Sequence, residues 1–218
     1  MAHRAEEKER RRQERIAQEE AARKAAARRR TLQVGGGVVL GLAVVAVVAI
    51  VALAGGTKDK PANVSKLTAD AKAAGCTFSQ FKSEGRNHTA SKVTYKTNPP
   101  TSGNHNPTPA EDGIYRAGNS PPKENFVHTL EHGRVEFQYK PGTPAADVAK
   151  LRRLAEEPFN GTSGYHVLLF ENDTNMPAQF AATAWTKSIT CPTLSTQAIG
   201  AMREFRQAFT DKGPEFIP

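Results

Sequence analysis

Residues 134–139 read Arg-Val-Glu-Phe-Gln-Tyr, and this alternation of apolar and polar side chains is typical of a β-strand. Val135, Phe137 and Tyr139 fall on one face of such a strand, so we expect that face to be buried and the opposite face to be wet. Outward from this strand, we predict a helix over 143–157, strands over 165–170 and 180–185, and a last helix that begins after Ser195.

The chain before this strand contains a predicted helix at 65–74 and a long loop at 98–122, which is rich in proline and glycine. A loop of this length inside a compact domain is usually functional. The order is therefore helix, loop, strand, helix, strand, strand, helix. This order predicts an α+β domain with a small mixed or antiparallel sheet packed with helices.

Residues 32–54 form an uncharged run in which only Gln33 is clearly polar. As a helix this run would be about 34 Å long, enough to cross the hydrocarbon core of a bilayer. We therefore predict a transmembrane helix at 32–54. The alternatives are a buried core helix and a signal peptide that is cleaved after Ala54.

Charge predicts the orientation of this span. Residues 1–31 form a predicted charged helix with eleven Lys or Arg and six Glu, and they hold +5 of the chain's net charge of +8. The positive-inside rule places this basic tail in the cytoplasm, followed by the span, a linker at 55–63 and an extracytoplasmic globular domain at 64–218. We expect the lipid bilayer as a partner, with an envelope protein as a second candidate. Because the charge is mostly a topology signal, we expect no nucleic-acid partner.

The chain has two cysteines, Cys76 and Cys191, and both lie in the predicted outer domain. An oxidising compartment favours a disulfide between them, which would join two distant parts of the domain. Two free buried thiols are the alternative.

Two histidines stand close together in residues 127–133, which read Val-His-Thr-Leu-Glu-His-Gly. In a short helix that starts near Asn125, His128 and His132 would lie one turn apart on the same face. Two imidazoles with this spacing can bind one metal ion.

Other residues complete the predicted metal site. His105, in the long loop, is a third candidate ligand, and His88 is the fourth. Imidazole nitrogens suit zinc or copper, so we expect Zn or Cu as the metal. Glu131 is predicted to orient a ligand and not to bind the ion itself.

Two other interpretations of the histidines remain open. The segment 128–132 also matches the H-x-x-E-H pattern of inverted zinc proteases, in which Glu131 would be the general base of a hydrolase. The histidines could instead only order the loop of an envelope structural protein. A binding module that is not an enzyme is the main hypothesis.

The segments Asn98–His105, Gly113–Tyr115 and Val127–Val135 occur in this order in the chain. Together they resemble the bacterial family known as domain of unknown function 3105, and Ala184-Trp185 and Gly213-Pro214-Glu215 also fit its pattern. The resemblance covers roughly residues 74–216, with Asn104 where the family commonly has proline. It implies an extracytoplasmic, usually membrane-anchored domain that is common in actinobacteria, and it implies no activity.

Overall fold

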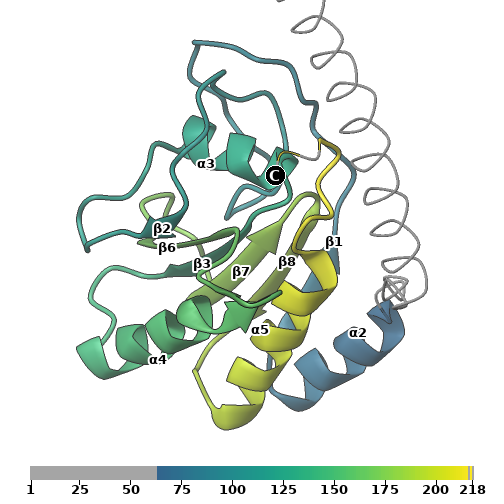
Figure 1. Cartoon of the computed structure of the whole chain (residues 1–218), viewed down its shortest axis with the longest axis vertical. Coiled ribbons are helices and arrows are strands. Elements are labelled where there is room, and N and C mark those ends of the chain that lie inside the picture. Colours follow the sequence, from purple (N-terminus) through teal and green to yellow (C-terminus); the bar gives the residue numbers. More distant parts are fainter. Residues whose placement is uncertain (1–62, 216, 218) are drawn as a thin grey trace, which may run out of the picture. The chain divides into compact units, whose positions relative to one another are not determined.

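Helices cover both faces of a six-stranded sheet in the computed structural model, which describes residues 63–215 and residue 217 (Figure 1). The helices are α2 (Val64–Ala73), α3 (Lys123–Glu131), α4 (Ala145–Glu156) and α5 (Thr196–Phe209). The strands of the sheet are β1 (Thr77–Gln80), β2 (Gly113–Ile114), β3 (Val135–Tyr139), β6 (Val167–Glu171), β7 (Phe180–Ala184) and β8 (Lys187–Cys191). A separate two-stranded pair consists of β4 (Pro158–Phe159) and β5 (Thr162–Ser163).

The sheet has the order β1-β8-β7-β3-β6-β2, and β3 lies near its centre. β3 pairs parallel with β6 and antiparallel with β7. The α+β class and the mixed sheet are therefore confirmed, as are the helices predicted at 65–74 and 143–157 and the strands predicted at 165–170 and 180–185. Of the strands in this sheet, the prediction missed β1, β2 and β8, which are short and carry little periodicity of their own.

Each face of the sheet has its own apolar core. Val135 and Phe137 of β3 pack on one face with residues of α2, α4 and α5. On the other face, Phe126 and Leu130 of α3 pack against Leu168 and other residues of the sheet. Strand β6 is apolar at nearly every position because both of its faces are covered. This arrangement places α3 and the long loop together on one side of the sheet.

The prediction of a wet face on β3 is wrong. All five residues of the strand are buried, including Glu136 and Gln138. α3 covers this face, and the polar side chains are paired with one another: Gln138 Nε2 donates to Glu136 Oε2 at 3.1 Å, and Thr183 Oγ1 donates to the same oxygen at 2.9 Å. The alternation of apolar and polar residues therefore predicted the strand correctly. Its polar residues, however, belong to a buried hydrogen-bond network and do not face solvent.

The ends of the helices show where capping residues in the sequence predicted a helix boundary correctly. Ser195 is the N-cap of α5, and its hydroxyl accepts from the backbone of Ala198 at 3.1 Å, as predicted. α3 begins at Lys123, two residues before the predicted cap at Asn125. His132 follows its last residue as the C-cap.

The predicted disulfide between Cys76 and Cys191 is confirmed. It joins the residue before β1 to the last residue of β8, two strands that already pair antiparallel. The bridge lies in the core on the side of α2 and α5, on the opposite face of the sheet from α3.

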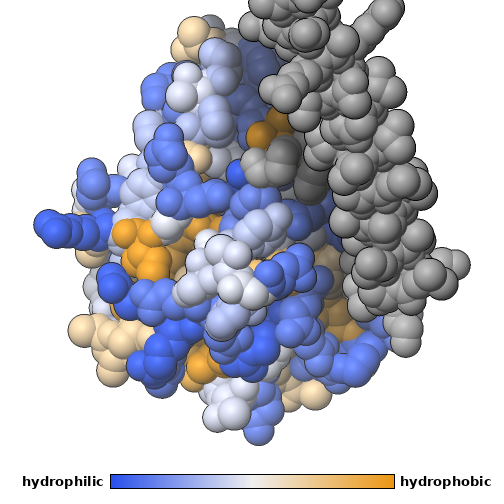
Figure 2. All heavy atoms as spheres, viewed as in Figure 1, coloured by the Kyte–Doolittle hydropathy of each residue, from blue (hydrophilic) through white to orange (hydrophobic). Residues whose placement is uncertain are grey.

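A groove of about 420 Å³ lies beside α4, with Ile114, Val148 and Leu169 in its lining. Figure 2 shows apolar side chains gathered over β2, while hydrophilic side chains cover much of the rest of this face. Because α4 and α3 cover opposite faces of the sheet, this groove does not belong to the histidine cluster.

The predicted cytoplasmic tail, transmembrane helix and most of the linker lie outside the described residues. Among the residues that the structure does describe, no helix has the length and apolar character needed to cross a membrane.

Candidate metal centre

Two histidines enter the cluster from neighbouring stretches of loop. His88 and His105 face each other in an isolated parallel bridge. The backbone of Thr89 donates to the carbonyl of His105 at 2.7 Å, and that of His105 donates to the carbonyl of Asn87 at 3.1 Å. These bonds hold the two imidazoles side by side, with ring centroids 5.2 Å apart.

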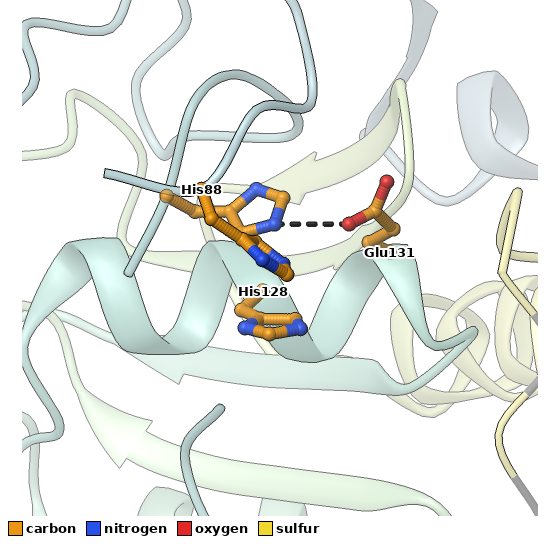
Figure 3. Close-up of side chains that lie close together, drawn as sticks. His88, His128 and Glu131 are labelled. Carbon is orange, nitrogen blue, oxygen red and sulfur yellow. Dashed lines mark ion pairs between the residues drawn. The ribbon is translucent and has the colours of Figure 1, made fainter. Parts of the chain in front are cut away.

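α3 supplies the other side chains of the cluster. His128 and Glu131 are three residues apart, so they lie on neighbouring positions of one helix face. The ligand atoms of His88, His105, His128 and Glu131 all lie within 4.8 Å of one another. Figure 3 shows the side chains of His88, His128 and Glu131 close together, with a dashed line for the ion pair of the Glu131 carboxylate with His105.

Backbone carbonyls determine which nitrogen of two rings carries the proton. His105 Nδ1 lies 2.8 Å from the carbonyl oxygen of Gly103, and His128 Nδ1 lies 2.6 Å from that of Asn106. Because a carbonyl oxygen only accepts, each Nδ1 must donate. In the neutral rings, both Nε2 atoms therefore carry lone pairs. A hydrogen bond from the second nitrogen to a carbonyl is typical of histidines that bind metals.

The buried His105 Nε2 has no hydrogen-bond partner, although Glu131 Oε2 lies 2.9 Å away. The contact has the distance of an ion pair without the geometry of a hydrogen bond. In a neutral ring, the Nε2 lone pair is left without a partner in the interior, beside the carboxylate. A cation bound by both groups would satisfy the unpaired nitrogen and the carboxylate together, so the pair fits a metal ion.

His132 extends the cluster from the C-cap of α3. Its Nε2 lies 2.9 Å from the Nε2 of His128, and the ring centroids are 4.4 Å apart. Burial is the main cause that lowers the pKa of His128 to about 4, and neighbouring histidines add to it. Burial also lowers the pKa of His132. Both rings are therefore neutral near pH 7, which is the form that binds metals.

Two charged side chains border the cluster at the surface. Arg86 Nε lies 4.0 Å from Glu131 Oε1, and the Arg86 side chain is 62% exposed. Glu215 Oε2 lies 3.9 Å from His132 Nε2. The cluster is thus buried at His105 and reaches solvent at His88 and beside His132.

The comparisons with known proteins place these residues in a family. Residues 87–216 match the model of a family described as Protein of unknown function (DUF3105). The chain belongs to this family. No curated protein and no solved structure matches the chain significantly. The DUF3105 match includes the whole histidine cluster, and its description names no activity.

Sequence reasoning found most of this DUF3105 cluster. The predicted ligands His88, His105 and His128 are brought together, and His132 contacts His128. Glu131 was predicted to orient a ligand, but its carboxylate lies among the candidate ligand atoms themselves. The fifth histidine of the domain is elsewhere, because His166 Nδ1 pairs with Asp211 Oδ1 at 2.6 Å.

Two features of this DUF3105 site were missed. The carbonyls of Gly103 and Asn106 carry no sequence signal, since every residue has one. Glu215 is far from His132 in the chain, and only the fold brings the two together.

Proposed function

We propose that this chain is a membrane-anchored extracytoplasmic protein whose globular domain binds a divalent transition-metal ion, Zn²⁺ or Cu²⁺, in the histidine cluster. His88, His105, His128 and Glu131 are its ligands, and His132 adjoins them. The observation that carries the proposal is the convergence of these four ligand atoms within 4.8 Å of one another, around a buried His105 Nε2 that has no hydrogen-bond partner.

The distances suit an ion of this size. Two donors that each bind zinc at about 2.1 Å lie no more than about 4.2 Å apart. The 2.9 Å separation of His105 Nε2 and Glu131 Oε2 is within this limit, and the widest pair of the group, at up to 4.8 Å, has to close only slightly. Three imidazole nitrogens and a carboxylate oxygen are ligands that Zn²⁺ and Cu²⁺ accept, and the group contains no sulfur ligand that would favour Cu⁺.

An account in which the histidines only order the loop explains the bonds to Gly103 and Asn106 equally well. It does not explain why two Nε2 atoms and a carboxylate converge on one place. A hydrolase with Glu131 as general base is also less well supported, because this carboxylate contacts His105 within the ligand group. We therefore propose binding and no enzymatic activity.

Metal analysis of the full-length chain tests the proposal. The protein is purified without a histidine tag, stripped with a chelator and titrated with Zn²⁺ or Cu²⁺. We expect about one bound ion per chain and a rise in melting temperature, because an ion at 100 times its Kd stabilises the fold by about 2.7 kcal/mol.

His128→Gln and His3→Gln are the matched variants. His128→Gln should weaken metal binding at least about tenfold, because it replaces a ligand nitrogen. His3→Gln should retain binding, since it makes the same change at a histidine outside the globular domain. A wild-type chain that binds neither ion and does not gain melting temperature would contradict the proposal.

The anchor rests on the apolar run at 32–54 and the basic segment before it. We expect the full-length chain to sediment with membranes, and a chain without residues 1–54, exported by an added signal peptide, to remain in the soluble fraction. A full-length chain that is released by a simple wash, or that is cleaved after Ala54, would contradict an anchor.

A further inference from the structure

The chain after α5 returns to the cluster. Residues 211–215, which we call the C-terminal strap, lie against the end of α3, and Figure 1 shows this yellow segment running back beside that helix. The backbone of Asp211 donates to the carbonyl of Gly133 at 2.9 Å, and that of Glu215 donates to the carbonyl of Glu131 at 3.1 Å. Backbone bonds therefore hold the strap to the residues that carry the cluster.

Glycines allow this close approach. A Cβ on Gly213 would lie 2.1 Å from the carbonyl oxygen of Glu131 and 2.3 Å from the nitrogen of Gly133. Neither backbone atom can move aside without disturbing the end of α3, so only glycine fits here. The ion pair of Asp211 with His166 at 2.6 Å secures the start of the strap.

The strap presents a carboxylate to the outer side of the cluster. Glu215 Oε2 lies 3.9 Å from His132 Nε2, and the exposed fraction falls from 49% for the Glu215 side chain to 12% for that of His132. His132 in turn lies 2.9 Å from His128. Glu215, His132 and His128 thus form a row of possible metal ligands that leads from solvent to the buried part of the cluster.

We infer that Glu215 is a further metal ligand, supplied by the C-terminal strap together with His132, so that metal binding and docking of the strap are coupled. This inference rests on the proposed function. A separation of 3.9 Å is too long for a hydrogen bond. It is within the distance of about 4.2 Å that two donors on one zinc ion can span. Coupling is reciprocal, so a bound ion must stabilise the docked strap to the same extent as the docked strap favours the ion.

A Zn²⁺ titration of the full-length chain against a competing chelator tests this inference with three variants. Glu215→Gln keeps the shape of the side chain and removes its charge, and it should weaken zinc binding by about 10- to 100-fold. Glu215→His restores a ligand of another type and should recover most of the affinity. Glu204→Gln removes an exposed carboxylate that pairs with Lys66, on the other side of the sheet, and should bind zinc like the wild type.

Hydrogen exchange supplies a second measurement. If Glu215 had only a structural role, zinc would not change the exchange rate of the strap. Zinc should slow exchange in the peptide that contains residues 210–218 of the wild-type chain, and this protection should be lost in Glu215→Gln. If wild type binds zinc and Glu215→Gln binds it equally well, the inference is wrong and the proposed function stands. If the wild type binds no zinc, the titration is repeated with Cu²⁺, and a wild type that binds neither ion contradicts the proposed function itself.

Discussion

His105 Nε2 and Glu131 Oε2 lie 2.9 Å apart in the interior, while the other ring nitrogen of His105 donates to the carbonyl of Gly103. The ring and the carboxylate come from the long loop and from α3, so the contact joins the two segments that form the cluster. His105 Nε2 has no hydrogen-bond partner, and a cation or an added donor would satisfy it beside the carboxylate.

Glu131→Gln should change the apo and the metal-bound protein in opposite directions. The amide can donate to His105 Nε2, so the chelator-treated variant should be more stable than the wild type by about 1 kcal/mol. The variant also loses an anionic ligand, so its rise in melting temperature with Zn²⁺ should be smaller. Melting curves in chelator and in excess Zn²⁺ measure both effects. If the variant is less stable in chelator and gains as much from Zn²⁺ as the wild type does, the prediction fails.

Acid should destabilise the apo protein through His128. Burial lowers the pKa of this ring to about 4 in the folded chain, whereas the unfolded ring keeps its ordinary pKa of 6.5. Between these values the unfolded state binds the proton and the folded state does not, so the free energy of unfolding falls as the pH drops from 6.5 to 4. The loss from this group is on the order of 3 kcal/mol.

Urea unfolding of the chelator-treated protein at several pH values between 7 and 4 measures this loss. His128→Gln has no titrating ring at this position, so its stability should depend less on pH over the same range. Equal pH dependence in the variant and the wild type would exclude His128 as the cause.

Glu136→Gln should be tolerated in spite of complete burial. Burial raises the pKa of the Glu136 carboxyl well above its ordinary value. Its surroundings also fit the neutral acid: Thr129 Oγ1 lies 2.6 Å from the carbonyl oxygen of Phe126 and 3.0 Å from Glu136 Oε1. The hydroxyl has one hydrogen, so a protonated Glu136 can satisfy the second contact. A glutamine amide can donate there in the same way.

The pH dependence of this variant follows from the sign of the shift. Above its ordinary pKa of 4.5 the unfolded carboxyl loses its proton and the folded one keeps it, so the wild type loses stability as the pH rises. Glu136→Gln removes this loss. Its stability relative to wild type should therefore increase from pH 5 to pH 8 in urea unfolding, and a difference that stays constant over this range would contradict the prediction.

Loss of the disulfide should lower stability and leave metal binding intact. Cys76 and Cys191 are 115 residues apart in sequence. In the chain-entropy model, a bridge that closes a loop of this length contributes about 4–5 kcal/mol. The double variant Cys76→Ala/Cys191→Ala should lose stability of this order in urea and still bind Zn²⁺ with the wild-type stoichiometry, because the bridge and the cluster lie on opposite faces of the sheet. Loss of metal binding under conditions in which the variant remains folded would contradict this separation.

Much of the fold was predictable because its signals are local. The apolar positions of β3 and β6, the cap at Ser195 and the proline-rich loop each depend on residues close together in the chain. Strands β1 and β8 were not predictable in the same way, because their partly polar sequences become strands through pairing with each other and with β7. The polar face of β3 was misjudged for a related reason: a buried network and a wet face have the same alternating sequence.

For the candidate metal site, the sequence by itself determined the residue types. It also determined that His128 and His132 are four residues, about one helical turn, apart. It also indicated His88 and His105 as further candidates and the two cysteines as a bridge. Only the tertiary structure decided that the Glu131 carboxylate lies among the ligand atoms, that carbonyls direct two Nε2 atoms inward, and that the strap brings Glu215 to His132. The physical reason is that helix periodicity is a short-range property of the chain, whereas the direction of a lone pair depends on backbone groups that only folding brings together.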